Sequence, residues 1–176
     1  MIDKSVYDLM KEKHGDVASW AVWVPAGDTP GFVFVGLNLS STHGDGARRG
    51  KVPWGNFHSG YRYQNDYKLR FALGGTQYWG SYITDLIKEY PEVDSGKVRE
   101  YLKANPKVVE KNVESFVKEI SHLGESHVLV AIGGDVYDHL KKFLGDRYRI
   151  AKIGHYADYQ SKEKYREEVL GSLEQY

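Results

Sequence analysis

The apolar run Phe32-Val33-Phe34-Val35 continues without a break into Gly36-Leu37-Asn38-Leu39-Ser40. A short run of β-branched and aromatic residues is typical of a strand that is buried on both faces, as in a parallel sheet. A second stretch of this kind, residues 148–154, leads directly into His155. Open parallel sheets bind ligands at the carboxyl ends of their strands. We therefore expect Asn38 and His155 to face one common ligand.

Further strands and helices are predicted around these two stretches. Residues 78–84 and 127–132 are apolar enough for two more strands, the first of them ending near Asp85. Helical spacing or capping signals mark residues 4–14, 64–74, 96–104, 106–123, 135–144 and 161–174. Strands that alternate with helices indicate an α/β protein with a mainly parallel sheet. The expected fold is a three-layer α/β/α domain with a central four-stranded sheet, spanning residues 1–176 as a single unit.

The composition excludes several classes of function. The chain has no cysteine, which rules out disulfides and thiolate chemistry. Its 24 basic residues balance its 24 acidic ones, whereas strong sequence-independent DNA binders usually carry a basic excess, although a local basic face is compatible with neutrality. The sequence shows neither a signal-peptide pattern nor an apolar stretch near 18 residues, so a cytoplasmic location and no membrane partner are expected.

Familiar catalytic motifs are missing from the chain. No phosphate-binding loop, dinucleotide-binding Gly-x-Gly-x-x-Gly, nucleophile elbow or His-Glu-x-x-His motif occurs. The segment Gly133-Gly134-Asp135 resembles an anion-binding turn, but an Asp135 side chain that caps the following helix explains it more simply.

Four residues near predicted strand ends have an ordinary explanation when each is taken alone. Asn38 suits a side-chain turn, His155 a satisfied loop histidine, Phe57 a core aromatic, and Asp85 a cap after its strand. Since all four belong to one edge of one sheet, their combination favours a functional site.

Four segments surround these residues, and in chain order they are Gly36-Leu37-Asn38-Leu39-Ser40, Asn56-Phe57-His58, Ile83-Thr84-Asp85-Leu86-Ile87-Lys88 and His155-Tyr156-Ala157. In this order they resemble the uracil-DNA glycosylase superfamily. Members of that group have a strand ending in Gly-x-Asn-Pro-Gly, an aromatic residue in the next loop, a strand with an Asn-bearing end, and a later strand ending in His-Pro-Ser. The likeness covers nearly the whole chain and is to short bacterial members.

The resemblance implies cleavage of the N-glycosidic bond of a base that is flipped out of damaged DNA. By family position, Phe57 is the platform for the base and Asn38 orients the attacking water. His155 donates a hydrogen bond to the departing base, and the backbone amides of Gly36 and Leu37 add further donors. This reaction needs no cofactor and no metal, and a monomer is expected.

DNA contacts are expected from the loops around this site. Their candidate residues are Ser40, Arg48, Arg49 and Lys51 for phosphates, and Tyr156 and Tyr159 for the gap that a flipped base leaves.

Asp85 departs from the family pattern, because an Asn often reads uracil at that position. An amide offers a donor and an acceptor, whereas an ionised carboxylate only accepts and would repel the O4 atom of uracil. The hypothesis that follows is a preference for a base with an additional N–H donor, such as hypoxanthine, xanthine or an amino-bearing lesion. Alternatively, Asp85 is protonated or turned outward.

Two other functions remain open from the sequence. One is a catalytically silent module that binds nucleic acid or nucleotides on the same fold. The other is an unrelated α/β hydrolase or transferase, which is disfavoured because no nucleophile–base pair is apparent.

Overall fold

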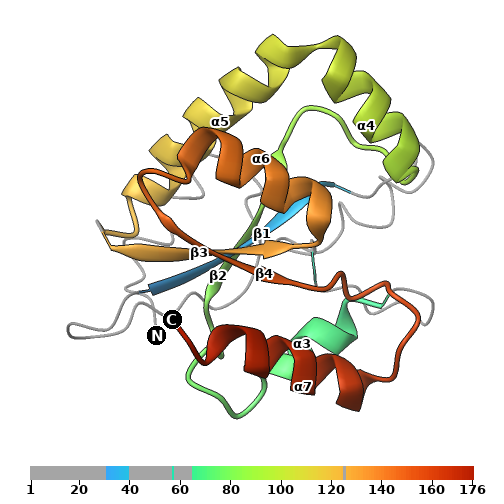
Figure 1. The fold of residues 1–176 in the computed structure, drawn as a ribbon, viewed down its shortest axis with the longest axis vertical. Helices are drawn as coiled ribbons and strands as arrows, with labels where there is room; N and C mark the ends of the chain where they lie inside the picture. Colours follow the sequence, from blue (N-terminus) through green and yellow to red (C-terminus); the bar gives the residue numbers. More distant parts are fainter. Residues whose placement is uncertain (1–30, 40–56, 58–64, 125) are drawn as a thin grey trace, which may run out of the picture.

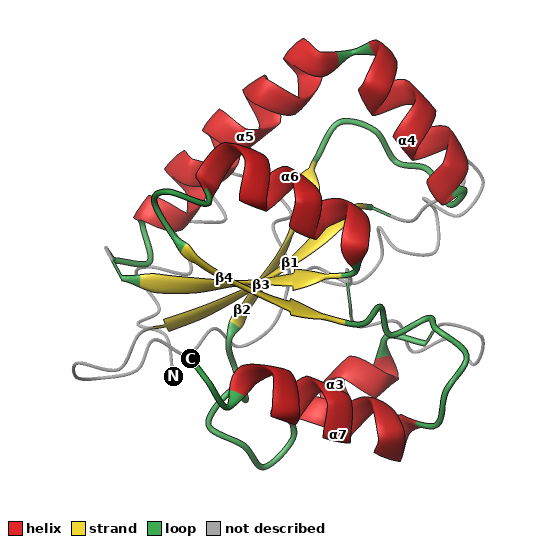
Figure 2. Cartoon of the chain, in the orientation of Figure 1, coloured by secondary structure: helices red, strands yellow, loops and turns green. Residues whose placement is uncertain are grey.

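The computed structural model describes residues 31–39, 57, 65–124 and 126–176, and within these ranges the chain forms a three-layer α/β/α fold (Figures 1 and 2). Four strands build one sheet in the order β2-β1-β3-β4, and every neighbouring pair is parallel. This arrangement confirms the predicted fold class. The helix predicted over residues 4–14 lies outside the described residues, as does all of the segment 41–63 except Phe57.

The strands are short and the helices connect them. The strands are β1 (Gly31–Asn38), β2 (Tyr82–Ile87), β3 (His127–Ile132) and β4 (Arg149–Ile153). The helices are α3 (Tyr67–Leu73), α4 (Ser95–Ala104), α5 (Pro106–Ser121), α6 (Gly134–Leu144) and α7 (Lys162–Leu173). In the described ranges, none of the helices combines the length and the apolar character that crossing a bilayer demands.

Helices cover both faces of the sheet, which explains why β1 is apolar at consecutive positions. Val33 and Val35 point into a core shared with α4, α5 and α6, while Phe34 points into a second core shared with α3 and α7. Figure 1 shows the two groups of helices on opposite sides of the sheet. Alternate β1 side chains thus enter different cores, and all three are at most 1% exposed. A strand buried in this way has no polar face to present to water.

The predicted boundaries of β2 are wrong by several residues. A turn comes first, in which the Ser81 amide and hydroxyl both donate to the carbonyl oxygen of Tyr78, at 3.2 and 2.8 Å. Gly80 adopts φ 84° in that turn, a conformation that glycine tolerates without steric cost. The strand therefore begins at Tyr82, and Asp85 lies inside β2, paired with Gly36 of β1, instead of following the strand.

A buried polar network, which the apolar pattern of α5 did not reveal, joins α5 to β2. Glu119 is 1% exposed, and its Oε1 accepts hydrogen bonds from the Tyr82 hydroxyl at 2.8 Å and the Thr84 hydroxyl at 2.6 Å. The Lys88 ammonium forms an ion pair with Oε2 at 2.9 Å and also donates to Thr84. Burial, together with the Glu119 charge, raises the pKa of Tyr82 far above its usual range, so Tyr82 stays a neutral donor.

Replacing Glu119 by Ala should destabilise the protein by about 3 kcal/mol, because it leaves the Lys88 charge and two buried hydroxyls without their shared acceptor. Urea unfolding followed by circular dichroism measures this difference. Glu89→Ala is the matched control, since the Lys111–Glu89 pair (3.2 Å) is about two-thirds exposed on both sides and should contribute less than about 1 kcal/mol. Equal destabilisation by both variants would show that the network adds no stability.

Candidate functional site

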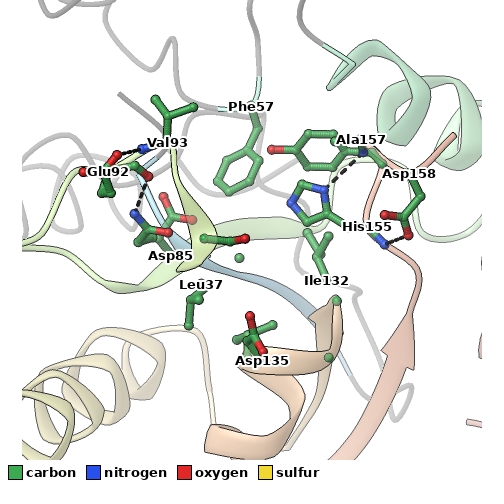
Figure 3. A pocket seen from close by; sticks show the side chains of 17 residues that line it. Leu37, Phe57, Asp85, Glu92, Val93, Ile132, Asp135, His155, Ala157 and Asp158 are labelled. Carbon is green, nitrogen blue, oxygen red and sulfur yellow. Dashed lines mark hydrogen bonds between the residues drawn. The ribbon is translucent and has the colours of Figure 1, made fainter. Parts of the chain in front are cut away.

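A cavity of about 500 Å³ lies at the carboxyl edge of the sheet (Figure 3). It is lined by Gly36, Leu37, Asn38, Phe57, Asp85, Glu92, Val93, Ser95, Ile132, Gly133, Gly134, Asp135, Val136, His155, Tyr156, Ala157 and Asp158. All four strands or the segments that directly follow them contribute to this lining. The parallel topology therefore brings together residues that are more than a hundred positions apart in the sequence.

Gly36 makes room for two of the side chains at this edge. It pairs with Asp85 across the β1–β2 ladder, and a Cβ atom at position 36 would collide with the Asp85 carboxylate. The same Cβ would lie 3.1 Å from Cζ of Phe57. The absence of a side chain at Gly36 thus allows both Asp85 and Phe57 to approach β1 at this position.

Phe57 forms the aromatic wall of the cavity. Its ring is 8% exposed and meets the Tyr156 ring edge to face, with centroids 6.5 Å apart. Its backbone has φ 61°, in the left-handed region that non-glycine residues rarely adopt. Such a conformation costs about 1–2 kcal/mol and is held only where the surroundings favour it. In Figure 3 the ring faces the hollow between Asp85 and His155.

Asn38 ends β1 and fastens the segment that follows β2. Its Nδ2 donates to the carbonyl oxygens of Glu92 at 2.9 Å and Tyr90 at 3.1 Å, with a third contact to Leu39 at 3.3 Å. The Glu92 amide donates in return to the Leu39 carbonyl at 3.1 Å. A local side-chain turn, the ordinary explanation for Asn38 taken alone, is not what these bonds form, because they reach a distant segment. With Nδ2 committed, Oδ1 is the Asn38 atom suited to accept a hydrogen bond from a ligand or water.

His155 is held in one tautomer by its own loop. Its Nδ1 accepts a hydrogen bond from the Ala157 amide at 3.1 Å, so the ring proton resides on Nε2. The His155 amide donates to Oδ2 of Asp158 at 3.2 Å. Burial lowers the pKa of the His155 ring below its ordinary value of 6.5, although the Asp158 charge partly opposes that shift. The side chain is therefore a neutral Nε2–H donor at neutral pH.

Helix α6 begins at the same cavity. Gly133 holds the N-cap position with φ 100°, and the helix has no side-chain cap. A Cβ atom added at Gly133 would lie 3.7 Å from Cβ and Cδ2 of His155, so the backbone here runs close to that side chain. The prediction that Asp135 caps the helix is wrong, because Asp135 lies in the first turn and pairs with Arg99 at 3.3 Å. The first amides of a helix lack partners within it, so this end can donate to an oxygen of a ligand.

The other charges around the cavity are acidic. Carboxylates of Asp85, Asp135 and Asp158 belong to the lining, and none of the described lining residues is a lysine or arginine. Glu92 turns its carboxylate to its own backbone, accepting from the Val93 and Asp94 amides at 2.8 and 2.9 Å. These bonds, the one from Asp94 first, lower the Glu92 pKa. The cavity therefore disfavours a ligand that is itself anionic before reaction.

The structure brings most of the predicted site residues to one place. Gly36, Leu37, Asn38, Phe57, Asp85, His155 and Tyr156 all line the cavity. Tyr156 packs with its ring 4.4 Å from that of His155 and forms part of the wall, whereas Tyr159 is fully exposed outside it. Ser40, Arg48, Arg49 and Lys51 lie outside the described residues.

Sequence reasoning missed the segment from Glu92 to Ser95, which closes one side of the cavity. Its position directly after β2 was the available signal, because segments that follow parallel strands meet at one edge.

Comparisons with protein-family models, with curated proteins and with solved structures find no match. In the described parts of the chain, no three side chains of His, Asp or Glu gather closely enough to hold a metal ion.

We expect the His155 ring to titrate below pH 6.5 in an NMR titration, because burial disfavours its charged form. Asp158→Asn should lower this pKa further, since the Asp158 charge is the contribution that raises it. Asp146→Asn, in the exposed turn after α6, is the control and should leave it unchanged. As the pH falls below 6.5, the unfolded chain takes up this proton first, so stability should decline until the folded-state pKa is reached. A ring that titrates above 6.5 would contradict the neutral donor.

Proposed function

We propose that this protein is a DNA glycosylase of the uracil-DNA glycosylase type, which hydrolyses the N-glycosidic bond of a flipped-out base. The observation that supports this function best is the convergence of Asn38, Phe57 and His155 on one cavity. Asn38 ends β1 and His155 follows β4, while Phe57 lies between β1 and α3 in the sequence. The cavity of about 500 Å³ falls in the range of small-ligand sites.

The residues present suit the demands of this reaction. Phe57 offers an aromatic face for the base, and the Oδ1 of Asn38 accepts a hydrogen bond from the water that attacks the sugar carbon. The C–N bond breaks, its electron pair leaves with the base, and negative charge develops on a base oxygen. The water oxygen forms the new C–O bond at the sugar carbon, and the proton that the water loses neutralises the departed base. The neutral Nε2–H of His155 and the amides at the start of α6 donate to that oxygen. A neutral imidazole is a sufficient donor here and needs no protonation before each turnover.

The position of Asp85 favours a base with N–H groups on the edge opposite the acceptor oxygen. Its carboxylate lies beside Gly36 and Phe57, on the β2 side of the cavity, while His155 lies on the β4 side (Figure 3). An ionised carboxylate accepts from N–H groups and repels carbonyl oxygens. The N1–H of hypoxanthine has a carbonyl on one side only, and xanthine has a further N–H at N3, opposite O6. The N3–H of uracil instead lies between two carbonyls, which the carboxylate would repel, so deaminated purines are the substrates that this wall fits better than uracil.

A second function, a nucleotide-binding or nucleic-acid-binding module without catalysis, is favoured by one observation. The Nδ2 of Asn38 is fully used in holding the segment 90–92, so Asn38 has a structural task whether or not a reaction occurs. Excision assays separate the two functions, because a module would bind lesion DNA without releasing free base.

The purified protein should release free base from lesion-containing oligonucleotides and leave an alkali-labile site. His155→Ala should slow this release by about 100-fold or more, because it removes a donor to the developing charge. His139→Ala on α6, which does not line the cavity, is the matched control and should retain the wild-type rate. Tight lesion binding without any base release across a panel of deaminated bases would support the binding module instead.

Asp85→Asn should shift the ratio of uracil release to hypoxanthine release toward uracil by about tenfold or more, because an amide also donates to O4. The two rates are measured on matched oligonucleotides that differ only in the lesion. Asp135→Asn removes a second carboxylate from the same cavity and should change the ratio less. A strong uracil preference in the wild type that persists in Asp85→Ala would remove Asp85 from base recognition.

A further inference from the structure

A second groove, of about 460 Å³, adjoins the cavity. It lies between the start of α3 and the segment that leads into α7, and it is lined by Asn65, Tyr67, Lys68, Ala157, Asp158, Tyr159, Gln160 and Ser161. Ala157 and Asp158 line both hollows, so the groove continues from the wall of the cavity that carries His155. A chain-like ligand that places one unit in the cavity would extend its next units along this groove.

Exposed aromatic rings accompany the groove. Tyr159 is fully exposed, Tyr67 is 42% exposed, and Phe71 is 37% exposed one helical turn after Tyr67 on the same face of α3. Exposed rings gathered in one place leave apolar surface in contact with water, which commonly marks a binding site. We call Tyr67, Phe71 and Tyr159 the α3 aromatic strip.

Two cations lie over the Phe71 ring of this strip. The Lys162 ammonium is 4.6 Å from the centroid of the Phe71 ring, and the Arg166 guanidinium is 5.8 Å from it. Helices α3 and α7, which supply these groups, run side by side on one face of the sheet (Figures 1 and 2). Aromatic rings interleaved with basic side chains are the usual surface for unpaired nucleotides, because bases stack on the rings and the cations lie near phosphates.

Hydrogen bonds from Lys68 and Arg166 hold the elements that carry the strip in place before any ligand arrives. Lys68 is 6% exposed, and its ammonium donates to the carbonyl oxygen of Asp158 at 3.1 Å, which fixes the segment between His155 and Tyr159 to α3. Nη1 of Arg166 donates to the carbonyls of Phe71, Ala72 and Gly74 at 2.7, 3.0 and 2.9 Å. Little conformational freedom of the protein is then lost on binding, so a few stacked bases are enough for measurable affinity.

We propose that the α3 aromatic strip binds the unpaired nucleotides next to the base in the cavity, and that the protein therefore binds single-stranded DNA in preference to duplex. This inference rests on the proposed function, because the placement of the strand along the groove assumes that one base occupies the cavity. In a duplex the neighbouring bases stay paired and stacked within the helix, so their faces are closed to Tyr67 and Tyr159. A single strand offers each base face to a ring without that cost.

The test uses the full chain and an undamaged, dye-labelled oligothymidylate of roughly ten nucleotides, a length within the usual site size of single-strand binders. Fluorescence anisotropy gives its affinity, and the same oligonucleotide in a blunt duplex is the comparison. Tyr67→Ala and Tyr159→Ala should each weaken single-strand binding by about fivefold or more, while Tyr67→Phe and Tyr159→Phe should keep it. Trp79→Ala removes another exposed aromatic, one that lines neither hollow, and should leave the affinity unchanged.

Each outcome bears on this proposal separately from the glycosylase reaction. Single-strand binding that depends on the two rings supports it even when no base is released from lesion DNA. Absence of single-strand binding, equal affinity for duplex, or wild-type affinity in both alanine variants overturns it, even when base release is observed. Thermal melting of each variant establishes that it is folded before its affinity is compared.

Discussion

β1 hydrogen-bonds in parallel to β2 on one side and to β3 on the other, and the site depends on this double pairing. The pairing sets Gly36 opposite Asp85 and carries Asn38 to the level of Ile87, where the segment after β2 begins. With the order β2-β1-β3-β4, the two outer strands are three spacings apart, about 14 Å. Residues from both ends of that span, Asp85 and His155, line one cavity of about 500 Å³ together with Gly36 of β1 and Ile132 of β3.

The sequence was sufficient to predict the fold class, because apolar runs such as residues 127–132 allow little else than a strand covered by helices on both faces. It was also sufficient for the convergence of Asn38 and His155, since parallel strands place their carboxyl ends at one edge. Element boundaries were harder. Nothing local distinguishes residues 78–81 from strand residues, and only the turn at Gly80, with its positive φ, separates them from β2.

The sequence did not predict which side chains form hydrogen bonds or ion pairs with one another. Asn38 was expected to face a ligand, yet its Nδ2 also bonds to carbonyls more than fifty residues away, which no local pattern encodes. Asp135 was expected to cap α6, but Gly133 holds the N-cap position two residues earlier and the Asp135 carboxylate pairs with Arg99 of α4. Glu119 stands among apolar residues of α5 and becomes intelligible only when Tyr82, Thr84 and Lys88 are seen to converge on it. In each case the decisive partner is distant in sequence and close in space.

The two walls of the cavity have opposite hydrogen-bonding character, and this difference constrains any ligand. The β4 wall presents donors, namely the Nε2–H of His155 and the amides at the start of α6, while the β2 wall carries the carboxylate of Asp85. For the base proposed to lie on Phe57, this arrangement favours a pose in which a carbonyl oxygen faces His155 and an N–H group faces Asp85. In the proposed reaction the Asp85 carboxylate opposes negative charge on the base, and the donors offset this effect because they lie on the opposite side of the cavity. The proposed base preference and the proposed reaction thus depend on the same difference between the two walls.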